Sequence, residues 1–527
     1  MKAYSKIYFP LIIGAACALG IFIGSVLDFP DTSEGIFTAN AKKEKLNRLI
    51  DYIDYEYVDD VNTDSIVDVT VNSILENLDP HSVYIPKQKY DAVSENMKGD
   101  FVGIGISFYT LEDTIAVIKP IPNGPSEKVG IKAGDRILYA DGIELAQKTI
   151  DTDSLSSLLK GKKNTTVKLK IKRNGSEKLL DFTVKRGTIP IKSVDAAYML
   201  NEKLGYIKIN RFAESTYKEF EKAIESLITQ GATELALDLR DNGGGYLDQA
   251  VKIADEFLTQ DKLIVFTKNK AGKINKTFST KKGKFKNTKV FVFINENSAS
   301  ASEIVAGALQ DNDIGTIVGR RSYGKGLVQR EMNLGDGSAV RLTVARYYTP
   351  TGRSIQKPYD HGDNKKYFEE YLSRYRNGEL QSKDSISVND SLKYTTPKGK
   401  IVYGGGGIIP DVFVAKDTDY EKESLNYMLK GGIMDRFIFN ILEKDRNYYN
   451  SLTQKEFNTQ QIVSDQIVED YINYLNEFNF DFKTKNYRYL LRKYLKASMA
   501  EQLFGTNAAQ KIISQDDKMI QKVLSLD

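Results

Sequence analysis

The stretch Glu234-Leu-Ala-Leu-Asp-Leu-Arg-Asp-Asn-Gly-Gly-Gly245 consists of a short, mostly apolar segment, three polar residues and three glycines. The apolar half predicts a buried strand, and the segment that follows at 247–258 predicts a helix. The same alternation continues through residues 189–350, which is typical of an α/β layer with a largely parallel sheet. The expected strands are 204–209, 234–239, 289–294 and 314–318, and the expected helices are 215–229, 247–258 and 300–309.

The composition excludes several classes of protein. The 527 residues are 41% hydrophobic and 27% charged, which is a globular composition with room for roughly three to four domains. Lys and Arg total 74 against 70 for Asp and Glu, and this near balance argues against a dedicated nucleic-acid-binding protein. A single cysteine rules out an internal disulfide and a multi-cysteine metal site. With only two histidines, an enzyme of this sequence is expected to use another residue as its base.

The N-terminus contains a candidate membrane anchor. Residues 7–27 are 21 consecutive residues without a charge, with Lys2 and Lys6 before them and acidic residues after them. At about 1.5 Å of rise per residue this length spans the hydrocarbon core. The flanking charges predict a cytoplasmic N-terminus, with the rest of the chain on the periplasmic or other extracytoplasmic face. A cleaved signal peptide is the alternative, although its apolar region is usually about 7–15 residues.

Residues 99–188 consist of short strands and turns. A glycine-bearing loop, Phe101-Val-Gly-Ile-Gly105, leads into a strand, and Gly130-Ile-Lys-Ala-Gly134-Asp-Arg-Ile-Leu138 forms a turn and a further strand. This region resembles a PDZ domain. In such a domain the backbone N–H groups of Phe101, Val102, Gly103, Ile104 and Gly105 would bind a terminal carboxylate, and the peptide would add as a strand to the sheet. The alternative is a small β domain without a ligand.

Two loops of the α/β region combine small residues with polar groups, at the carboxyl ends of strands where chemistry gathers in such sheets. The glycines of loop 240–245 allow consecutive N–H groups to point at one anion. In loop 298–303, Ser-Ala-Ser-Ala-Ser-Glu, Ser300 and Glu303 form a capping-box pair, and any of the three serines could cap the next helix. A hydroxyl there could instead react, because the helix dipole favours a developing negative charge. The spacing leaves the choice of serine open.

The third loop, Gly319-Arg-Arg-Ser-Tyr-Gly-Lys-Gly326, nearly matches the phosphate-binding pattern G-x-x-x-x-G-K-[ST]. Gly326 stands where that pattern needs a hydroxyl, and residues 327–344 predict a β-hairpin instead of a helix, so a nucleotide site is disfavoured. Lys325 is either solvated or buried between its two glycines. Burial lowers the pKa of a lysine from about 10.4 toward about 7–8, which makes the amine a usable general base.

Taken in order, these three loops resemble the carboxy-terminal processing peptidases, which are serine endopeptidases with a Ser-Lys dyad. Residues 347–355 and 405–411 add further matches, and the resemblance extends from about residue 75 to 415. It implies that Ser300 is the nucleophile, that Lys325 is its base and that Gln329 orients the lysine. The near absence of histidine fits this scheme.

The resemblance also implies accessory groups. Asp311 matches an acidic position that is sometimes included in the family's site. The oxyanion hole would combine the backbone N–H of Ala301 with that of Gly244 or Gly245. No metal or cofactor is needed for this chemistry.

The sequence thus predicts a multidomain protein, α+β overall, with an α/β peptidase core, an inserted PDZ domain and helical terminal regions. The expected parts are a membrane anchor at 1–28, a helical region at 29–98, the PDZ domain at 99–188, the core at 189–415 with an insertion at 357–402, and a helical region at 416–527. Expected partners are protein substrates bound by their C-termini and the membrane; an adaptor or a second copy remains open. Neither the insertion nor the C-terminal region receives a role. The competing functions are a catalytically inactive PDZ scaffold of the cell envelope and, less favoured, a nucleotide-binding protein that uses residues 319–325.

Overall fold

The computed structural model describes residues 41–111, 114–145, 152–286, 288–417, 424–425, 427–429, 431–477 and 487–526. The chain divides into two compact units, Met1–Ser73 and Ile74–Asp527. The predicted membrane anchor at 7–27 lies outside the described residues. Among the helices that are described, none is both long enough and apolar enough to cross a membrane.

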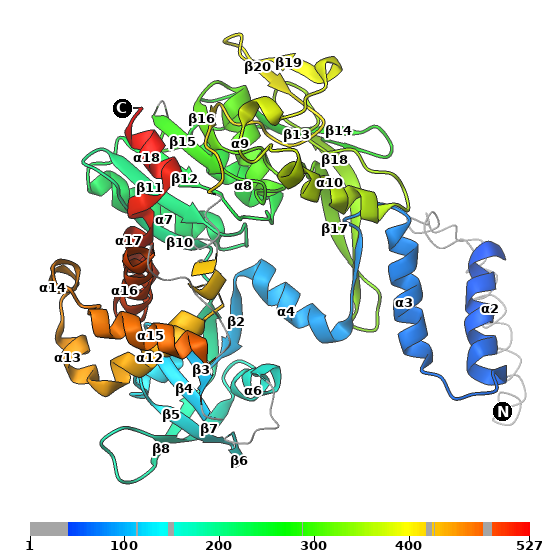
Figure 1. Cartoon of the computed structure of the whole chain (residues 1–527). Coiled ribbons are helices and arrows are strands. Elements are labelled where there is room, and N and C mark those ends of the chain that lie inside the picture. Colours follow the sequence, from blue (N-terminus) through cyan, green and yellow to red (C-terminus); the bar gives the residue numbers. More distant parts are fainter. Residues whose placement is uncertain are drawn as a thin grey trace, which may run out of the picture. The chain divides into compact units, whose positions relative to one another are not determined.

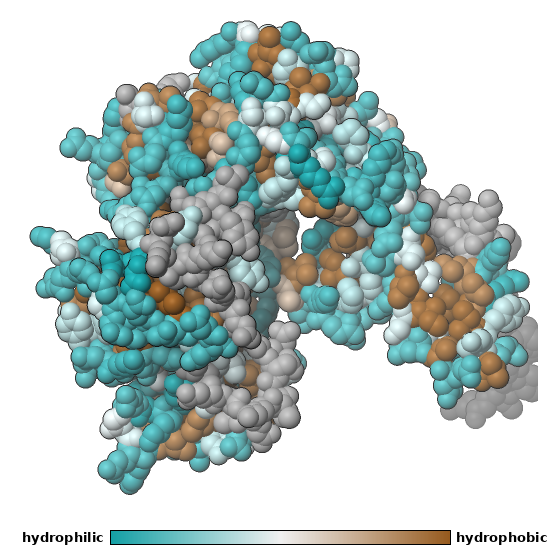
Figure 2. Space-filling view, in the orientation of Figure 1, coloured by the Kyte–Doolittle hydropathy of each residue, from teal (hydrophilic) through white to brown (hydrophobic). Residues whose placement is uncertain are grey.

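Helices occupy most of the region predicted to be helical before residue 98. They are α2 (Ala41–Glu56), α3 (Thr63–Glu76) and α4 (Lys87–Lys98) (Figure 1). The short strand β1 (Val83–Ile85), which the sequence pattern did not predict, follows α3 in the chain. In the first unit, Thr63 Oγ1 donates a hydrogen bond to Asp54 Oδ1 at 2.7 Å. Figure 2 shows apolar surface on α2 and α3, where Leu49 and Val69 are exposed.

The PDZ region is an antiparallel sheet in the strand order β3-β4-β5-β7-β8, with β6 paired to β5. Its strands are β3 (Ile106–Leu111), β4 (Thr114–Pro120), β5 (Arg136–Ala140), β6 (Ile143–Glu144), β7 (Thr166–Lys172) and β8 (Leu180–Lys185), and its helices are α5 (Pro125–Lys128) and α6 (Thr152–Leu159). Buried and exposed residues alternate strictly along β7, as expected for a strand with one face on the core. Strands β2 (Asp100–Gly103) and β9 (Gly187–Pro190) pair antiparallel and bring the two ends of this region together.

The α/β region contains a six-stranded sheet in the order β10-β11-β12-β15-β16-β21. Its strands are β10 (Val194–Met199), β11 (Leu204–Ile209), β12 (Glu234–Asp238), β15 (Lys289–Ile294), β16 (Gly315–Gly319) and β21 (Val412–Phe413). All neighbouring pairs are parallel except β10 with β11. The predicted helices are α7 (Thr216–Thr229), α8 (Leu247–Asp255) and α9 (Ala301–Asp311). The predicted alternation and the largely parallel sheet are therefore confirmed.

The two faces of this sheet have different coverings. Leu235 and Leu237 of β12 belong to the core cluster that also contains the buried side chains of α7, α8 and α9. Ala236, between them, belongs to a second cluster that includes Met519 and Val523 of α18 (Lys518–Leu524). Alternate residues of a strand point to opposite faces, so the last helix of the chain covers the face that the other helices leave open.

A second sheet has the strand order β1-β18-β13-β14, with β17 paired to β18. Its remaining strands are β13 (Leu263–Asn269), β14 (Ile274–Phe278), β17 (Leu327–Asn333) and β18 (Ala339–Tyr348). The pair β17 and β18 is the hairpin predicted for residues 327–344. The insertion contains α10 (Asn364–Arg376), two short 3-10 turns, and the strands β19 (Lys393–Thr395) and β20 (Ile401–Tyr403).

The C-terminal region is helical, as predicted. Its elements are α12 (Ile433–Lys444), α13 (Arg446–Ser451), α14 (Gln454–Thr459), α15 (Asp465–Asn476), α16 (Arg488–Phe504), α17 (Thr506–Ile513) and α18. Helices α12 to α17 enclose an apolar core of their own, whereas α18 packs on the sheet of the α/β region. The bundle contacts the PDZ region through Lys119 Nζ, which donates to the Glu501 carbonyl at 2.8 Å. It contacts the α/β region where the Asn507 side chain exchanges hydrogen bonds with the Ala197 backbone.

Candidate active site

Ser300 lies at the turn between β15 and α9. Its backbone has φ 55° and ψ −112°. Residues other than glycine adopt this conformation at a cost of about 1–3 kcal/mol. The backbone N–H donates to Glu303 Oε2 at 2.8 Å, which forms the glutamate half of the predicted capping box. A strained strand-to-helix turn of this kind presents a hydroxyl at the end of a sheet, where a substrate can reach it.

The three serines of this loop have different environments. Ser298 Oγ donates to the Leu239 carbonyl at 2.8 Å, and Ser302 Oγ donates to the Asn242 carbonyl at 2.9 Å. Both of these side chains are fully buried, whereas Ser300 is partly exposed. Two of the serines thus fix the neighbouring glycine loop, and Ser300 is the one that a substrate could meet.

Lys325 lies in the loop between β16 and β17, which leads into a strand and not into the helix that a phosphate-binding loop needs. The amine Nζ donates to Gln329 Oε1 at 2.8 Å, and Gln329 Nε2 in turn donates to the backbone carbonyl of His81. Burial, together with the positive charge of Arg341, lowers the pKa of Lys325 to about 8. Among the described contacts, no hydrogen bond joins this amine to Ser300; such bonds often form only when substrate binds.

The carboxylate of Glu303 connects the serine loop, residues 298–303, to the lysine loop, residues 321–326. Besides the Ser300 N–H, its Oε2 accepts from the backbone N–H of Lys325 at 2.9 Å, and its Oε1 accepts from the N–H of Gly324 at 2.8 Å and from the Ser322 hydroxyl. The side chain is completely buried. Burial raises the pKa of Glu303 to about 7 against the opposing effect of these hydrogen bonds. One carboxylate therefore fixes the backbones of both candidate catalytic residues.

Tyr347 makes a second connection between the same two loops. Its hydroxyl donates to the Lys325 carbonyl at 2.6 Å and lies 3.1 Å from the Ser300 carbonyl. The sequence pattern included this tyrosine without giving it a role. Its position at the end of β18 brings the second sheet against the site.

The glycine loop packs directly against Ser300. A Cβ atom at Gly244, which has φ +103°, would lie 2.8 Å from Ser300 Cβ and 3.0 Å from the backbone nitrogen of Ala301, so only glycine fits. The N–H of Gly244 already donates to Asn242 Oδ1 at 2.9 Å. In the described structure the N–H groups of Gly245 and Ala301 have no acceptor, and they remain as candidate donors to an oxyanion.

Arg240 anchors the start of this glycine loop. Its guanidinium bonds the buried carboxylate of Asp238 at 2.6 Å and that of Asp517, just before α18, at 2.7 Å. Burial alone would raise the pKa of Asp238, but the charge of Arg240 outweighs it and lowers the pKa to about 2. No local sequence pattern indicates this contact, because Asp517 lies 277 residues away from the arginine.

Asp311 lies away from the other candidate catalytic residues. It ends α9, which begins beside Ser300, and eleven residues of helix rise about 16 Å. Its carboxylate forms an ion pair with Arg353 at 2.7 Å, with both side chains fully buried, and also accepts from Thr351 Oγ1 at 2.7 Å. The contacts of Asp311 hold the segment after β18 against the helix.

Of the predicted peptide-binding residues, 101–103 lie in β2, which pairs with β9, and only Ile104 and Gly105 form the connection between β2 and β3. Gly105 has φ +75°, and a Cβ atom there would meet Ile189 Cδ1 at 2.8 Å. Phe101 lies under Lys160 Nζ, 4.9 Å from the ring centre, and packs against Gly103. Val102 accepts from the Gly161 N–H at 3.3 Å. Within the described residues, the buried N–H groups of Ile104 and Gly105 have no acceptor, which suits a loop that binds a carboxylate.

The segment before β1 supports the site from the other side. Asp79 accepts hydrogen bonds from the backbone N–H groups of His81 and Ser82, each at 2.9 Å. The His81 ring nitrogen Nε2 lies 2.8 Å from the Tyr367 hydroxyl. Burial, with the charge of Lys325, lowers the pKa of His81 to about 3. His81 is therefore neutral at ordinary pH and already has a partner, and its carbonyl positions Gln329.

Comparison with known proteins identifies the family of the chain. Peptidase family S41 matches residues 203–362, and the PDZ domain family matches 102–184. The carboxy-terminal-processing protease of Bartonella bacilliformis is 37% identical over 306 residues, which are 57% of this chain and 69% of that protein. The chain belongs to the S41 peptidases. The carboxy-terminal processing proteases CtpA and CtpB of Bacillus subtilis are 34% and 35% identical, over 68% and 64% of this chain and 76% and 72% of theirs.

This S41 peptidase is a serine-type enzyme of the carboxy-terminal processing group and contains a PDZ domain. Its C-terminal bundle matches a further family at residues 424–505, a family of unknown function. The predicted class of enzyme and the combination of core and PDZ domain are confirmed.

Proposed function

We propose that this S41 peptidase cleaves peptide bonds with Ser300 as nucleophile and Lys325 as general base. The observation that carries the proposal is the Glu303 carboxylate, which accepts from the backbone N–H groups of both residues, together with a Lys325 pKa lowered to about 8. A lysine of ordinary pKa would be almost fully protonated near neutral pH and could not accept a proton.

The reaction follows from these positions. The neutral amine of Lys325 takes the Ser300 proton as the oxygen attacks the peptide carbonyl. The oxyanion accepts hydrogen bonds from the N–H of Ala301, at the start of α9, and from the N–H of Gly245, in the glycine loop. The lysine returns its proton to the leaving amine, and the acyl-enzyme is then hydrolysed by water that the same lysine deprotonates. Gln329 holds the amine between the two steps.

Substrate recognition belongs to the PDZ domain in this proposal. The buried N–H groups of Ile104 and Gly105 bind the terminal carboxylate, and the peptide extends along the edge strand β3. Recognition of the chain end and cleavage of a bond then occur at separate places. An unstructured protein with an apolar C-terminus is the expected type of substrate.

The proposal also places the protein at a membrane, with residues 7–27 as an anchor and the enzyme on the outer face. Support comes from the length of that uncharged segment and from Lys2 and Lys6 before it. Fractionation of cells should recover the chain with membranes, and protease added outside should cleave it. A chain that lacks residues 1–28 should lose both properties, and recovery of the full chain in the cytosol would contradict the anchor.

The test of the enzyme compares folded variants on an unstructured protein substrate. Ser300→Ala and Lys325→Ala should each lower cleavage by several orders of magnitude, and the double variant should lose little more, because the two residues act as a unit. Lys325→Arg should remain inactive, since a guanidinium stays protonated. Ser298→Ala is the matched control and should keep far more activity than Ser300→Ala. If Lys325→Arg folds by circular dichroism and cleaves at the wild-type rate, the assignment is wrong.

The second candidate function is an inactive PDZ scaffold, which would bind C-termini without cleaving them. The partly exposed Ser300 and the lowered pKa of Lys325 argue against it. A fluorophosphonate probe distinguishes the two, because only a reactive serine becomes labelled. Peptide binding without labelling or cleavage would favour the scaffold.

A further inference from the structure

The lysine loop, residues 321–326, has no helical or strand structure, yet its backbone groups are bonded on both sides. On the N–H side, Gly324 and Lys325 donate to Glu303, and Tyr323 donates to the Ser298 carbonyl at 3.0 Å. These partners all come from the serine loop and the helix it begins. The N–H groups thus fix the lysine loop to the nucleophile.

The carbonyl side of the same loop is bonded by the insertion. Arg374 of α10 donates from Nη1 to the Ser322 carbonyl at 2.8 Å and from Nη2 to the Tyr323 carbonyl at 3.2 Å. The backbone N–H of Lys357 donates to the next carbonyl, that of Gly324, at 2.9 Å. Three consecutive carbonyls directly before Lys325 therefore accept hydrogen bonds from residues beyond 356.

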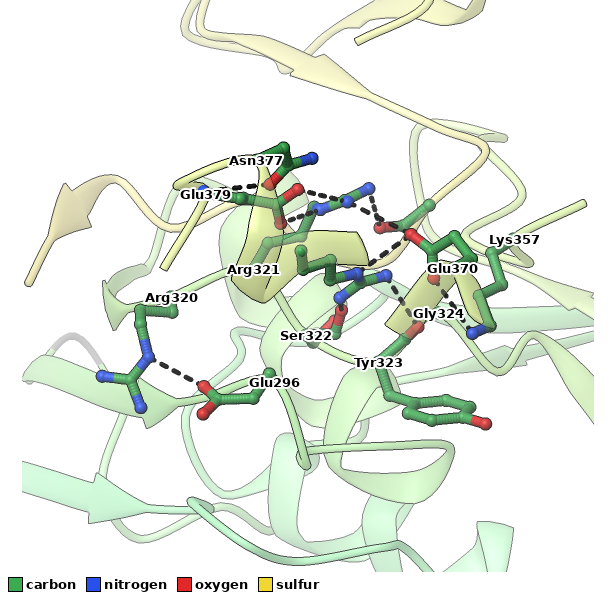
Figure 3. Close-up of polar contacts among 12 residues, drawn as sticks. Glu296, Arg320, Arg321, Ser322, Tyr323, Gly324, Lys357, Glu370, Asn377 and Glu379 are labelled. Carbon is green, nitrogen blue, oxygen red and sulfur yellow. Dashed lines mark hydrogen bonds and ion pairs between the residues drawn. The ribbon is translucent and has the colours of Figure 1, made fainter. Parts of the chain in front are cut away.

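The charged groups of this contact balance one another. Arg374 is 1% exposed, and a buried guanidinium is costly unless it is paired. Glu370, one turn earlier on α10, accepts from Arg374 Nε at 3.0 Å and from Lys357 Nζ at 3.0 Å. Glu370 therefore pairs with both cations, and Figure 3 shows it beside Lys357, to which a dashed line joins it. The arrangement is fully hydrogen bonded, which makes it rigid.

A second ion pair extends the contact along the insertion. Arg321, the first residue of the loop, bonds the buried carboxylate of Glu379 just after α10 at 2.6 Å (Figure 3). The amine of Lys357 also lies 3.9 Å from the ring centre of Tyr367 and 4.6 Å from that of Tyr323. The insertion therefore covers the lysine loop from its first residue to Gly324.

We infer that α10 and the residues around it form a clamp on the lysine loop, with Arg374 as the residue that positions Lys325 for catalysis. The inference rests on the proposed role of Lys325 as the base. Fixed carbonyls at 322, 323 and 324 fix the path of the chain into Lys325, and its amine must meet the Ser300 proton within hydrogen-bond distance. A misplacement of about 1 Å can lower a rate about 10²-fold. Arg374 is buried at 1% exposure and out of reach of a bound peptide, so its loss should lower kcat and leave KM largely unchanged.

The experiment compares Arg374→Met with Arg376→Met in the full chain. Arg376 is exposed on the same helix, so the control removes the same charge without touching the loop. Three quantities are measured: hydrogen exchange of the amides at 322–326, kcat and KM for an unstructured protein substrate, and the pH dependence of kcat/KM. Arg374→Met should speed amide exchange, lower kcat about 10²-fold and move the apparent pKa up from about 8, because water reaches the amine. The control should match wild type in all three.

Wild-type exchange and wild-type kcat in folded Arg374→Met would overturn the clamp, and so would faster exchange with unchanged kcat. Glu370→Gln is the second variant if Arg374→Met does not fold. It keeps the size of the side chain, which is 36% exposed, and removes the charge that holds both cations. It should show the same three changes to a smaller degree, and unchanged values would refute the clamp. Failure of the proposed function appears separately, as wild-type cleavage by Lys325→Ala, which leaves the amide-exchange result for Arg374 intact.

Discussion

Replacing Lys325 with methionine should abolish cleavage and yet stabilise the protein at neutral pH. Burial, with repulsion from Arg341, lowers the pKa of the amine from 10.5 to about 8. One pKa unit corresponds to about 1.36 kcal/mol, so the charged lysine costs the folded state about 3 kcal/mol at pH 7. Methionine removes the charge and keeps an unbranched apolar chain. Gln329 Oε1 loses the hydrogen bond from Lys325 Nζ at 2.8 Å, and this loss costs about 1 kcal/mol of the gain. The expected net gain is about 2 kcal/mol.

The direction of the pH dependence follows from the same pKa values. Below pH 8 the folded and the unfolded chain both carry the Lys325 proton, and the cost to the folded state is fully present. Between pH 8 and 10.5 the folded lysine is neutral while the unfolded lysine still binds a proton, so the cost decreases as the pH rises. Above about pH 10.5 neither state holds the proton, and methionine should bring no gain from this source.

The assay is urea unfolding followed by circular dichroism at pH 7 and at pH 10.5. Ser300→Ala serves as the background, because it prevents self-cleavage and keeps the lysine, and Ser300→Ala/Lys325→Met is compared with it. The unfolding midpoint of the double variant should be higher at pH 7, and most of the difference should disappear at pH 10.5. An equal loss of stability at both pH values would show that the lysine is not held out of water, and the account of its lowered pKa would fail.

Three further outcomes are expected. Gly244→Ala should fold but lower kcat about 10²–10³-fold, measured on the same protein substrate, because the new methyl group overlaps Ser300 and the N–H of Ala301; wild-type kcat would place the oxyanion elsewhere. Asp311→Asn should lower the free energy of unfolding by about 3–5 kcal/mol, since it leaves Arg353 buried without its charge partner, while kcat per folded enzyme stays unchanged; a large loss of kcat would return Asp311 to the site. Amidation of a substrate's C-terminus should weaken its binding by isothermal calorimetry, and equal affinity of the amide and the free acid would exclude carboxylate capture at Gly105.

Local sequence patterns predicted the α/β sheet because its strands are short, apolar and separated by helices of clear periodicity. Strand β15 and the hairpin β17–β18 were predicted on this basis. Strand β14 carries mostly exposed side chains, and β1 has only three residues, so neither has a hydrophobic pattern to detect. Likewise, no pattern in α18 indicates that it would cover the second face of the sheet, because its partners lie hundreds of residues earlier.

The candidate site divides in the same way. Ser300, Lys325 and Gln329 lie in short motifs that could be recognised in the sequence. Glu303 was visible only as a capping residue, because three of its four hydrogen bonds reach residues 19 to 22 positions further along the chain. The contact of Arg374 with the lysine loop spans 52 positions and consists of hydrogen bonds to backbone carbonyls. Because every residue has a backbone carbonyl, such bonds leave no pattern in the sequence. Long-range backbone contacts are thus the part of the site that only the folded chain displays.

The dependence of kcat/KM on pH tests the central claim most directly. If Lys325 is the base, kcat/KM of the wild-type enzyme should rise about tenfold per pH unit and level off above an apparent pKa near 8, the value that burial gives this amine. His81, with a pKa lowered to about 3, would give no rise in this range. A profile that is flat from pH 6 to 9, or one that levels off near the ordinary histidine pKa of about 6.5, would contradict the Ser300–Lys325 mechanism.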